Sequence, residues 1–307
     1  MPVLGKDNRK GIIWIASYPR SGNTWTRAFL HALAAVMRDP GVEAIDINRI
    51  EEGSVVENAA ALYPRFLNKA VFLASPAEIA AARPWVQAAL VESAGRTIYV
   101  KTHNANALDH GVPLINMGVS LGAVYIVRNP LDVAISYAHL NDVDIDAMIE
   151  RMATRGWGVG RTNDNGIEKV RVVMGSWSEN VESWTQPPHP AVLVLRYEDL
   201  LDNPEAGFLK MARHIHLKPT REQLRRAIAL SRFDRLRSQE DRDGFAEKPA
   251  KSEAAFFREG RAGQWRERLT EAQVARIVAD HGPTMKRFGY LPDASGRRSQ
   301  DRRATRA

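Results

Sequence analysis

The chain has 307 residues, of which 44% are hydrophobic, with a formal net charge of +7 and no cysteine. This apolar share is sufficient for a sizeable core and too high for a disordered chain, and the lack of cysteine excludes disulfides, thiolate catalysis and Cys-ligated zinc. No apolar run is long enough for a signal-peptide core or a membrane span, so we expect a cytoplasmic protein without membrane contact. The mildly basic charge suits an anionic ligand, and the lack of a basic stripe with interleaved aromatic residues argues against nucleic acid.

Four apolar runs, each followed by a polar turn, predict the strands of one sheet. These runs are 11–16, 96–103, 122–130 and 191–200. Helices are predicted over 23–37, 130–140 and 204–217. The last two begin at signals that are typical of a helix start, a proline in the first turn and the sequence Asp-Asn-Pro-Glu. Strands that alternate with helices favour an α/β fold, P-loop-like, with a central parallel β-sheet flanked by α-helices and ligands at the carboxyl ends of the strands.

Three long connections interrupt this alternation. Residues 46–95 are Ala-rich and predicted to be irregular, 142–173 contain the stretch TRGWGVGRTNDNG, and 241–261 form another connector. Loops of this length in a compact domain are typically binding loops or lids. We expect one domain over 1–292 and a basic, disordered tail over 293–307.

The stretch SYPRSGNTW, Ser17–Trp25, joins the first strand to the first helix and is suited to bind a phosphate. Backbone N–H groups converge in such a turn, and the helix N-terminus adds a partial positive charge. Arg20 supplies a full charge, and Gly22 allows the backbone a close approach. Further hydrogen-bond donors are Ser21, Asn23 and Thr24. The alternative is a capped turn in which a polar side chain caps the helix and Arg20 is solvated.

A candidate proton acceptor ends the second strand. Period-two alternation places Lys101 and His103 on the same side of this strand end. A histidine with an ordinary pKa near 6.5 beside a cation suits proton abstraction near neutral pH. The alternative is a hydrogen-bonded surface histidine next to a solvated lysine.

A second anion site is predicted where the third strand ends. Arg128 leaves the strand, and Ser136 lies two helical turns further along, on the same face as His139. An arginine and a serine that converge at a strand end can bind an anion. The alternative is an ion pair of Arg128 with Asp132 beside an ordinary helical serine.

A cationic loop lies near the end of the chain, in the segment 254–268. Arg258, Gly260 and Arg261 make it positive and flexible, and aromatic residues flank it. Such a loop could close over a phosphate, and it could equally be a surface loop that is held by its aromatic side chains.

In their joint order these segments resemble the motifs of the cytosolic-type sulfotransferases, which transfer a sulfuryl group from 3′-phosphoadenylyl sulfate (PAPS). SYPRSGNTW is similar to that family's 5′-phosphosulfate loop, VYIVRNPLDVAISYAHL to its 3′-phosphate motif, and VKTH to the segment with the catalytic base. RYEDL, FFREGRAGQW and GSWSENVESW match further family patterns, so the resemblance runs from residue 11 to 290. In the residues of these motifs the sequence is most similar to bacterial glycopeptide sulfotransferases, which share the SYP loop and the GSW pattern.

The resemblance implies transfer of a sulfuryl group from PAPS to a hydroxyl or amine of a small-molecule acceptor, with release of PAP and no metal. It implies that His103 is the general base, assisted by Lys101 and Arg20, and that Arg128 and Ser136 bind the 3′-phosphate. The other implied co-substrate contacts are Ser21, Gly22, Asn23, Thr24, Trp25, Tyr197, Ser231, Phe233, Arg258, Glu259 and Gly260. Sulfuryl transfer, like phosphoryl transfer, needs an in-line approach and cations where charge collects.

The chain departs from the family pattern at two charged positions and at the dimer motif. Arg20 replaces the usual loop lysine, and Glu259 replaces a lysine of the R-K-G sequence, so we expect Glu259 to point to solvent. The dimer motif is not recognisable after Trp265, so the sequence gives no oligomeric state. The acceptor pocket is expected between the three long connections, with the aromatic side chains of Tyr63, Phe66, Trp85, Trp157 and Phe245.

Two other functions are compatible with parts of the sequence. A P-loop kinase or ATPase would require a Lys-Ser/Thr loop and a carboxylate at a strand end for magnesium, whereas the loop reads Arg20-Ser21-Gly22 and Asp199 follows its strand late. A non-catalytic nucleotide-binding or nucleic-acid-binding protein would use the basic charge but would not require His103 beside Lys101.

Overall fold

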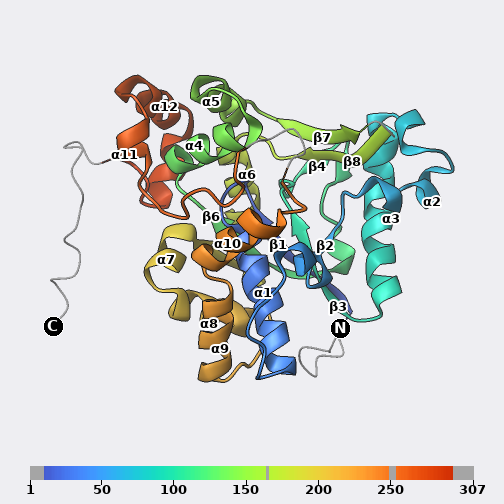
Figure 1. Ribbon diagram of the computed structural model, residues 1–307. Helices are drawn as coiled ribbons and strands as arrows, with labels where there is room; N and C mark the ends of the chain where they lie inside the picture. Colours follow the sequence, from blue (N-terminus) through green and yellow to red (C-terminus); the bar gives the residue numbers. More distant parts are fainter. Residues whose placement is uncertain (1–9, 164–165, 249–253, 293–307) are drawn as a thin grey trace.

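A five-stranded parallel sheet forms the centre of the molecule (Figure 1). The computed structural model describes residues 10–163, 166–248 and 254–292. Every pair of neighbouring strands is parallel. In spatial order the strands are β2 (Val55–Val56), β3 (Thr97–Thr102), β1 (Gly11–Ser17), β6 (Ser120–Val127) and β9 (Val192–Arg196).

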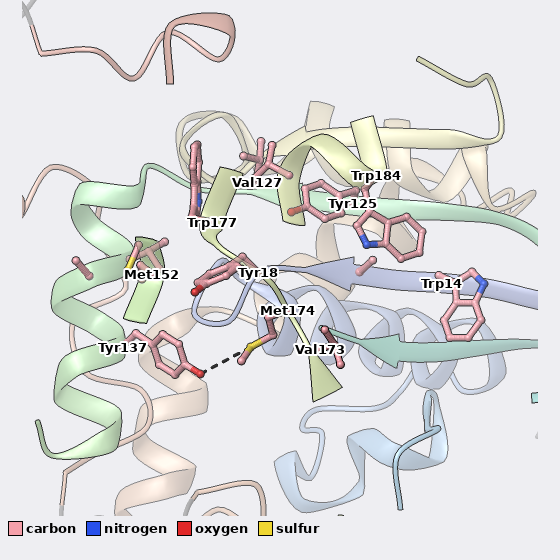
Figure 2. Close-up of a cluster of buried hydrophobic side chains, with 14 of the residues drawn as sticks. Trp14, Tyr18, Tyr125, Val127, Tyr137, Met152, Val173, Met174, Trp177 and Trp184 are labelled. Atoms are coloured by element: carbon pink, nitrogen blue, oxygen red, sulfur yellow. Dashed lines mark hydrogen bonds between the residues drawn. The ribbon is translucent and has the colours of Figure 1, made fainter. Parts of the chain in front are cut away.

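The sheet is buried on both faces, as alternation along β1 shows. Ile12, Trp14 and Ala16 belong to one hydrophobic cluster, and Ile13 and Ile15 belong to another. Since side chains alternate along a strand, the two clusters lie on opposite faces of the sheet. Helices α4 (Pro130–Asn141), α5 (Ile145–Ala153), α6 (Trp177–Thr185) and α12 (Glu271–Arg287) supply the first cluster, part of which Figure 2 shows. The second receives α1 (Asn23–Arg38), α8 (Pro204–His214) and α9 (Arg221–Leu230).

The remaining elements are short or lie at the edges of this sheet and its covering helices. The helices are α2 (Pro64–Leu67), α3 (Pro76–Ala94), α7 (Tyr197–Asp202), α10 (Phe233–Asp243) and α11 (Trp265–Arg268). Single 3₁₀ turns are η1 (Ile47–Glu52), η2 (Ala60–Leu62), η3 (Val71–Leu73) and η4 (Met117–Val119). Two small antiparallel pairs are β4 (Leu108–Asp109) with β5 (Val112–Pro113) and β7 (Gly158–Asn163) with β8 (Gly166–Val173). No helix among the described residues is long and apolar enough to cross a membrane.

The prediction that 46–95 is irregular is wrong, because this segment contains the 19-residue helix α3. A capping box between Ser75 and Glu78 fixes the start of this helix. Its buried face includes Arg83 and Gln87 among the apolar residues. These polar positions remove the apolar periodicity by which an amphipathic helix is recognised in a sequence.

Other segments and boundaries also differ from the prediction. The segment 142–173 is not a loop, since it forms α5 and the hairpin β7–β8. The strand predicted over 191–200 ends at Arg196, where α7 begins with two acidic residues in its first turn. Helix α8 ends at His214, three residues before the predicted end. The basic tail lies outside the described residues, and the division into a domain and a tail stays a prediction.

A buried polar network ties α3 to the carboxyl end of β3. Glu57 accepts a hydrogen bond from Asn104 Nδ2 at 2.7 Å, and its other oxygen lies 3.5 Å from the Arg83 guanidinium. Arg83 also donates to the carbonyl of Arg171 in β8, at 2.8 Å. All three polar side chains of the network are at most 2% exposed. The network therefore fixes the backbone directly after His103.

We predict that Glu57→Ala destabilises the fold by about 3–5 kcal/mol, because it leaves the Arg83 guanidinium buried without its counter-ion. Denaturant unfolding measures this change. The matched control is Glu52→Ala, which removes a carboxylate from the exposed Arg49–Glu52 pair and should leave stability unchanged. Equal stability of the two variants would contradict the prediction.

Candidate active site

The loop between β1 and α1 is a tight turn whose backbone packs closely against a neighbouring ring. Arg20 and Gly22 both have positive φ angles, 64° and 103°. A Cβ atom on Gly22 would lie 2.8 Å from the Tyr197 ring, so the backbone packs against that ring as only glycine permits. The Asn23 side chain donates to the carbonyl of Ile15 at 2.9 Å and thereby holds the loop against β1. The first backbone N–H groups of α1 are consequently presented at the carboxyl edge of the sheet.

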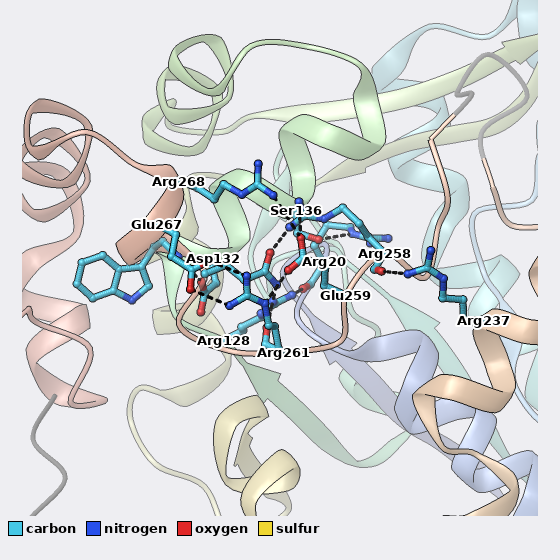
Figure 3. Close-up of polar contacts among 12 residues, drawn as sticks. Arg20, Arg128, Asp132, Ser136, Arg237, Arg258, Glu259, Arg261, Glu267 and Arg268 are labelled. Atoms are coloured by element: carbon cyan, nitrogen blue, oxygen red, sulfur yellow. Dashed lines mark hydrogen bonds and ion pairs between the residues drawn. The ribbon is translucent and has the colours of Figure 1, made fainter.

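Arg20 and Arg128 lie in one cluster of polar contacts, and among the described residues neither has a carboxylate partner (Figure 3). Arg20 donates to Ser136 Oγ at 3.0 Å and to the carbonyl of Phe256 at 2.8 Å. Arg128, only 6% exposed, donates to the carbonyls of Arg20 and Arg261 at 2.8 and 3.2 Å. Within the described residues neither arginine forms a salt bridge, and Arg128 Nε is buried without a partner. The cluster is therefore chemically suited to bind an anion.

Burial and positive neighbours disfavour the charged form of Arg20. Burial, followed by the neighbouring Arg128 and Arg258, lowers the pKa of Arg20 to about 10, against the opposing effects of Tyr197 and Glu240. Arg258 lies on the cationic loop, and burial also lowers its pKa. An anion that binds between these guanidiniums would reverse the shifts by favouring their charged forms.

The proposed alternative pair of Arg128 with Asp132 does not form. Asp132 instead accepts hydrogen bonds from the backbone N–H groups of Gly263 and Trp265, at 2.7 and 3.0 Å. This carboxylate therefore fixes the base of the cationic loop and leaves the Arg128 charge available. The loop comes close to Phe233 at Gly260, where the positive φ of 62° and the nearby ring leave no room for a side chain.

His103 lies directly after β3 with its ring oriented by β1. Its Nδ1 is 2.8 Å from the carbonyl of Ser17. Because a carbonyl can only accept, Nδ1 carries the hydrogen and Nε2 keeps its lone pair. Burial, followed by the adjacent Lys101 ammonium, lowers the pKa of His103 to about 3. The imidazole is therefore neutral at physiological pH, with its Nε2 unprotonated.

One cavity of about 510 Å³ joins the anion cluster to His103. Of the residues predicted for the site, it is lined by Arg20, Gly22, Asn23, Thr24, Trp25, Lys101, His103, Arg128, Ser136, Tyr197, Phe233, Arg258, Glu259 and Gly260. Ser21 and Ser231 do not line it. Ser21 is fully buried, and the Ser231 hydroxyl donates to the carbonyls of Ala227 and Ile228 at the end of α9. The resemblance implies a co-substrate contact for Ser231, but its hydroxyl bonds to the backbone at the C-terminal end of α9.

The expectation that Glu259 points to solvent is wrong. Its carboxylate pairs with Arg261 at 2.7 Å and Arg258 at 3.2 Å, and its side chain is 24% exposed. Arg268 lies 3.9 Å away on the other side. The Glu259 carboxylate is therefore engaged in ion pairs with arginines of the cationic loop and does not point freely to solvent.

The five aromatic residues expected at the acceptor end do not line the cavity. Tyr63 is buried in a separate cluster beside α3, Trp85 is 66% exposed, and Phe245 packs on Phe256 and Phe257. The three long connections do contribute to the wall, but through other residues: Val56, Glu57, Asn58, Val159, Gly160, Lys169, Val172, Glu247, Phe256 and Phe257. Helix α4 adds Tyr137, Leu140 and Asn141, and Met174 follows directly after β8. No local pattern in the sequence marks these positions, because each reaches the cavity through tertiary packing.

The described residues contain no group of three or more His, Cys, Asp or Glu side chains that could hold a metal ion. A family model described as the sulfotransferase domain matches residues 10–289. Sulfotransferase 1A1 of Bos taurus is 26% identical over 279 residues, which is 88% of this chain and 82% of the relative. Sulfotransferase 1A1 of Canis lupus familiaris is 29% identical over 197 residues, so the match spans 62% of either protein.

Solved structures show the same fold. Retinol dehydratase in a complex with retinol and PAP has a TM-score of 0.59 at 19% identity, over 92% of this chain and 84% of that one. Mouse sulfotransferase SULT7A1 complexed with PAP has a TM-score of 0.53 at 19% identity, over 91% and 86%. The predicted α/β fold with a central parallel sheet is thereby confirmed.

We predict that His103 stays neutral in the folded protein above about pH 5, since its pKa is lowered from 6.5 to about 3. The unfolded chain then binds a proton that the folded chain rejects, so stability falls as the pH falls from 6.5 toward 3. NMR titration of the ring, assigned by comparison with His103→Gln, measures the first effect. Acid unfolding measures the second, which should be smaller in that variant. A ring that titrates near 6.5 would contradict the prediction.

Proposed function

The chain belongs to the sulfotransferase domain family, and we propose that it transfers a sulfuryl group from PAPS to a hydroxyl or amine of a small-molecule acceptor and releases PAP. The observation that carries this proposal is the joint presence, in one cavity, of two guanidiniums without counter-ions and a neutral histidine. PAPS supplies negative charge at two points, the 5′-phosphosulfate and the 3′-phosphate. The two ends of the arginine cluster offer one cation to each.

The co-substrate lies along the carboxyl edge of the sheet. Arg20, the N-terminus of α1 and Thr24 hold the 5′-phosphosulfate, and Arg128 with Ser136 holds the 3′-phosphate. Arg258 and Gly260 close over it from the cationic loop. Trp25, Tyr197 and Phe233 flank the adenine. The Trp25 and Tyr197 rings already pack edge to face, with 5.9 Å between their centroids. Ser21 contributes through its backbone, since its hydroxyl is buried away from the cavity.

His103 acts as the general base of the transfer. Its Nδ1–H is held by the Ser17 carbonyl, so Nε2 takes the acceptor's proton as the acceptor oxygen or nitrogen attacks sulfur. Lys101 and Arg20 stabilise the negative charge on the sulfuryl and bridging oxygens. A base with a pKa near 3 is weak, but the negative charge of bound PAPS favours the protonated imidazole and raises this pKa. The histidine thus becomes a competent base only when the co-substrate is in place.

The acceptor is an alcohol, phenol or amine with a large apolar body. This follows from the far end of the cavity, which is lined by Tyr137, Leu140, Val159, Val172 and Met174. A mostly apolar wall with a few convergent polar groups is the usual form of a small-molecule site. The retinol dehydratase structures with retinol or androsterone illustrate such apolar molecules in a protein of the same fold.

We also propose a kinship with bacterial glycopeptide sulfotransferases and a cytoplasmic location. The first rests on the SYP loop and on GSWSENVESW, in which Ser176 caps α6 and Asn180 donates to the carbonyl of His103 at 3.1 Å. This pattern therefore supports the histidine directly. The second rests on the lack of cysteine in the sequence.

We predict that Arg128→Ala weakens PAP binding by about 30-fold or more, because losing a buried charged partner costs about 2–5 kcal/mol. Calorimetry with PAP, PAPS and ATP measures this effect. The matched control is Arg221→Ala, which removes an exposed arginine that pairs with Glu205 on the surface and should bind PAP normally. Binding of ATP without PAP would instead support a P-loop kinase or ATPase.

We predict that His103→Ala reduces sulfuryl transfer from labelled PAPS by about 10²- to 10⁴-fold and leaves PAP affinity nearly unchanged, because the base acts on the acceptor and not on the nucleotide. His110→Ala, an exposed histidine between β4 and β5, serves as the control and should retain full transfer. Transfer that persists in His103→Ala would assign the base to another group.

A further inference from the structure

Glu247 places a carboxylate between two cations in the cavity wall. One oxygen accepts from Arg27 at 2.6 Å, and the other accepts from Lys101 Nζ at 2.9 Å. The side chain of Glu247 is 8% exposed, that of Lys101 is 16%, and that of Arg27 is fully buried. Arg27 is in turn fixed by Ser54, whose hydroxyl accepts from its Nε at 2.6 Å. Arg27 therefore holds the Glu247 carboxylate rigidly from the side away from the cavity.

The backbone around Glu247 is anchored independently of this ion pair. The N–H of Ala246 donates to Asn48 Oδ1 at 2.7 Å, and Asn48 Nδ2 donates to the carbonyl of Gly244 at 3.2 Å. Phe245 is buried against Phe256 and Phe257. These contacts hold the segment in place, so the Glu247 charge is not needed to keep it there.

Glu247 balances a local excess of positive charge next to the base. The charged or titratable groups that act on Lys101 and His103 are Arg27 from α1, Lys169 from β8, Glu247, and each other. Burial lowers the pKa of Lys101, and Glu247 is the group that opposes this change. Arg27 and Lys101 together hold the pKa of the Glu247 carboxyl well below its usual range, against the effect of burial. Without Glu247, Arg27 and Lys101 would lose the carboxylate that lies between them, and both cations lower the pKa of His103.

We propose that Glu247 is a positioning residue for sulfuryl transfer, which orients the Lys101 ammonium beside His103 and keeps it charged, with Arg27 as its fixed support. This inference rests on the proposed function. Glu247 does not touch the reacting atoms; it acts through Lys101. When sulfuryl oxygens approach, Lys101 can turn toward them from a defined starting point, and the remaining Glu247–Arg27 pair keeps the wall neutral.

The test is Glu247→Gln, which keeps the size of the side chain and removes its charge. Loss of the carboxylate lowers the pKa of Lys101. The alkaline limb of the kcat/KM profile should therefore move to lower pH by about one pH unit or more. At a fixed pH on that limb, kcat/KM should be roughly tenfold lower for each pH unit by which the limb moves. PAP affinity should change less than about threefold, since Arg20 and Arg128 are untouched.

A double-mutant cycle with Lys101→Met shows whether Glu247 acts through Lys101. The effect of Glu247→Gln should largely disappear in the Lys101→Met background. Asp243→Asn, which removes an exposed carboxylate four positions earlier in the same segment, should leave rate and profile unchanged. An unshifted profile in Glu247→Gln, or full additivity with Lys101→Met, would overturn the proposal.

The wild type and a double variant show whether the proposed function fails or only this inference. If wild type neither binds PAP nor transfers sulfuryl groups, the proposed function fails; if wild type is active and Glu247→Gln keeps its profile, only this inference fails. Should Glu247→Gln not fold, because Arg27 is left buried without a counter-ion, Arg27→Met/Glu247→Gln removes that charge as well. The double variant carries the same prediction for the alkaline limb, and an unshifted limb in it also overturns the proposal.

Discussion

The site depends on positive charge that the protein holds without neutralising it. Arg20 and Arg128 are fixed by three backbone carbonyls and by Ser136, and their guanidiniums lie 4.5 and 4.4 Å from the ring centroids of Phe256 and Tyr197. Carbonyl oxygens and ring faces carry only partial negative charge, so they orient a guanidinium without cancelling it. In the part of the chain that the structure describes, no carboxylate forms a salt bridge with either guanidinium, so a bound anion would supply the balancing charge.

This constraint explains the environment of the neighbouring carboxylates. Asp132 is the acidic residue nearest in sequence to Arg128, yet two backbone N–H groups of the cationic loop occupy both its oxygens. Glu259 is engaged by the other arginines of that loop. Glu198 accepts from the N–H of Asn129 and from the Tyr290 hydroxyl. Each of these three carboxylates thus has partners other than the two central guanidiniums.

The opposite end of the cavity follows a different rule. There Glu247 pairs with both Arg27 and Lys101, and Glu57 lies beside Arg83, so carboxylates offset part of the positive charge, and the wall is otherwise largely apolar. A molecule with an anionic and an apolar part would meet two distinct environments in one cavity. His103 lies at the junction, where its neutral ring is compatible with both.

The sequence alone determined four of the five strands of the sheet, the loop after β1, and the positions of Lys101, His103 and Arg128 at strand ends and of Ser136 on the helix that follows β6. Parallel strands bring their carboxyl ends to one edge, so local motifs far apart in the chain become neighbours as soon as the topology is known. Only the tertiary structure decided that α3 has a polar buried face, that Glu259 pairs within its loop and that Glu247 reaches Lys101 across 146 residues. Such contacts depend on how elements pack, and packing leaves no periodic or local signal in the sequence.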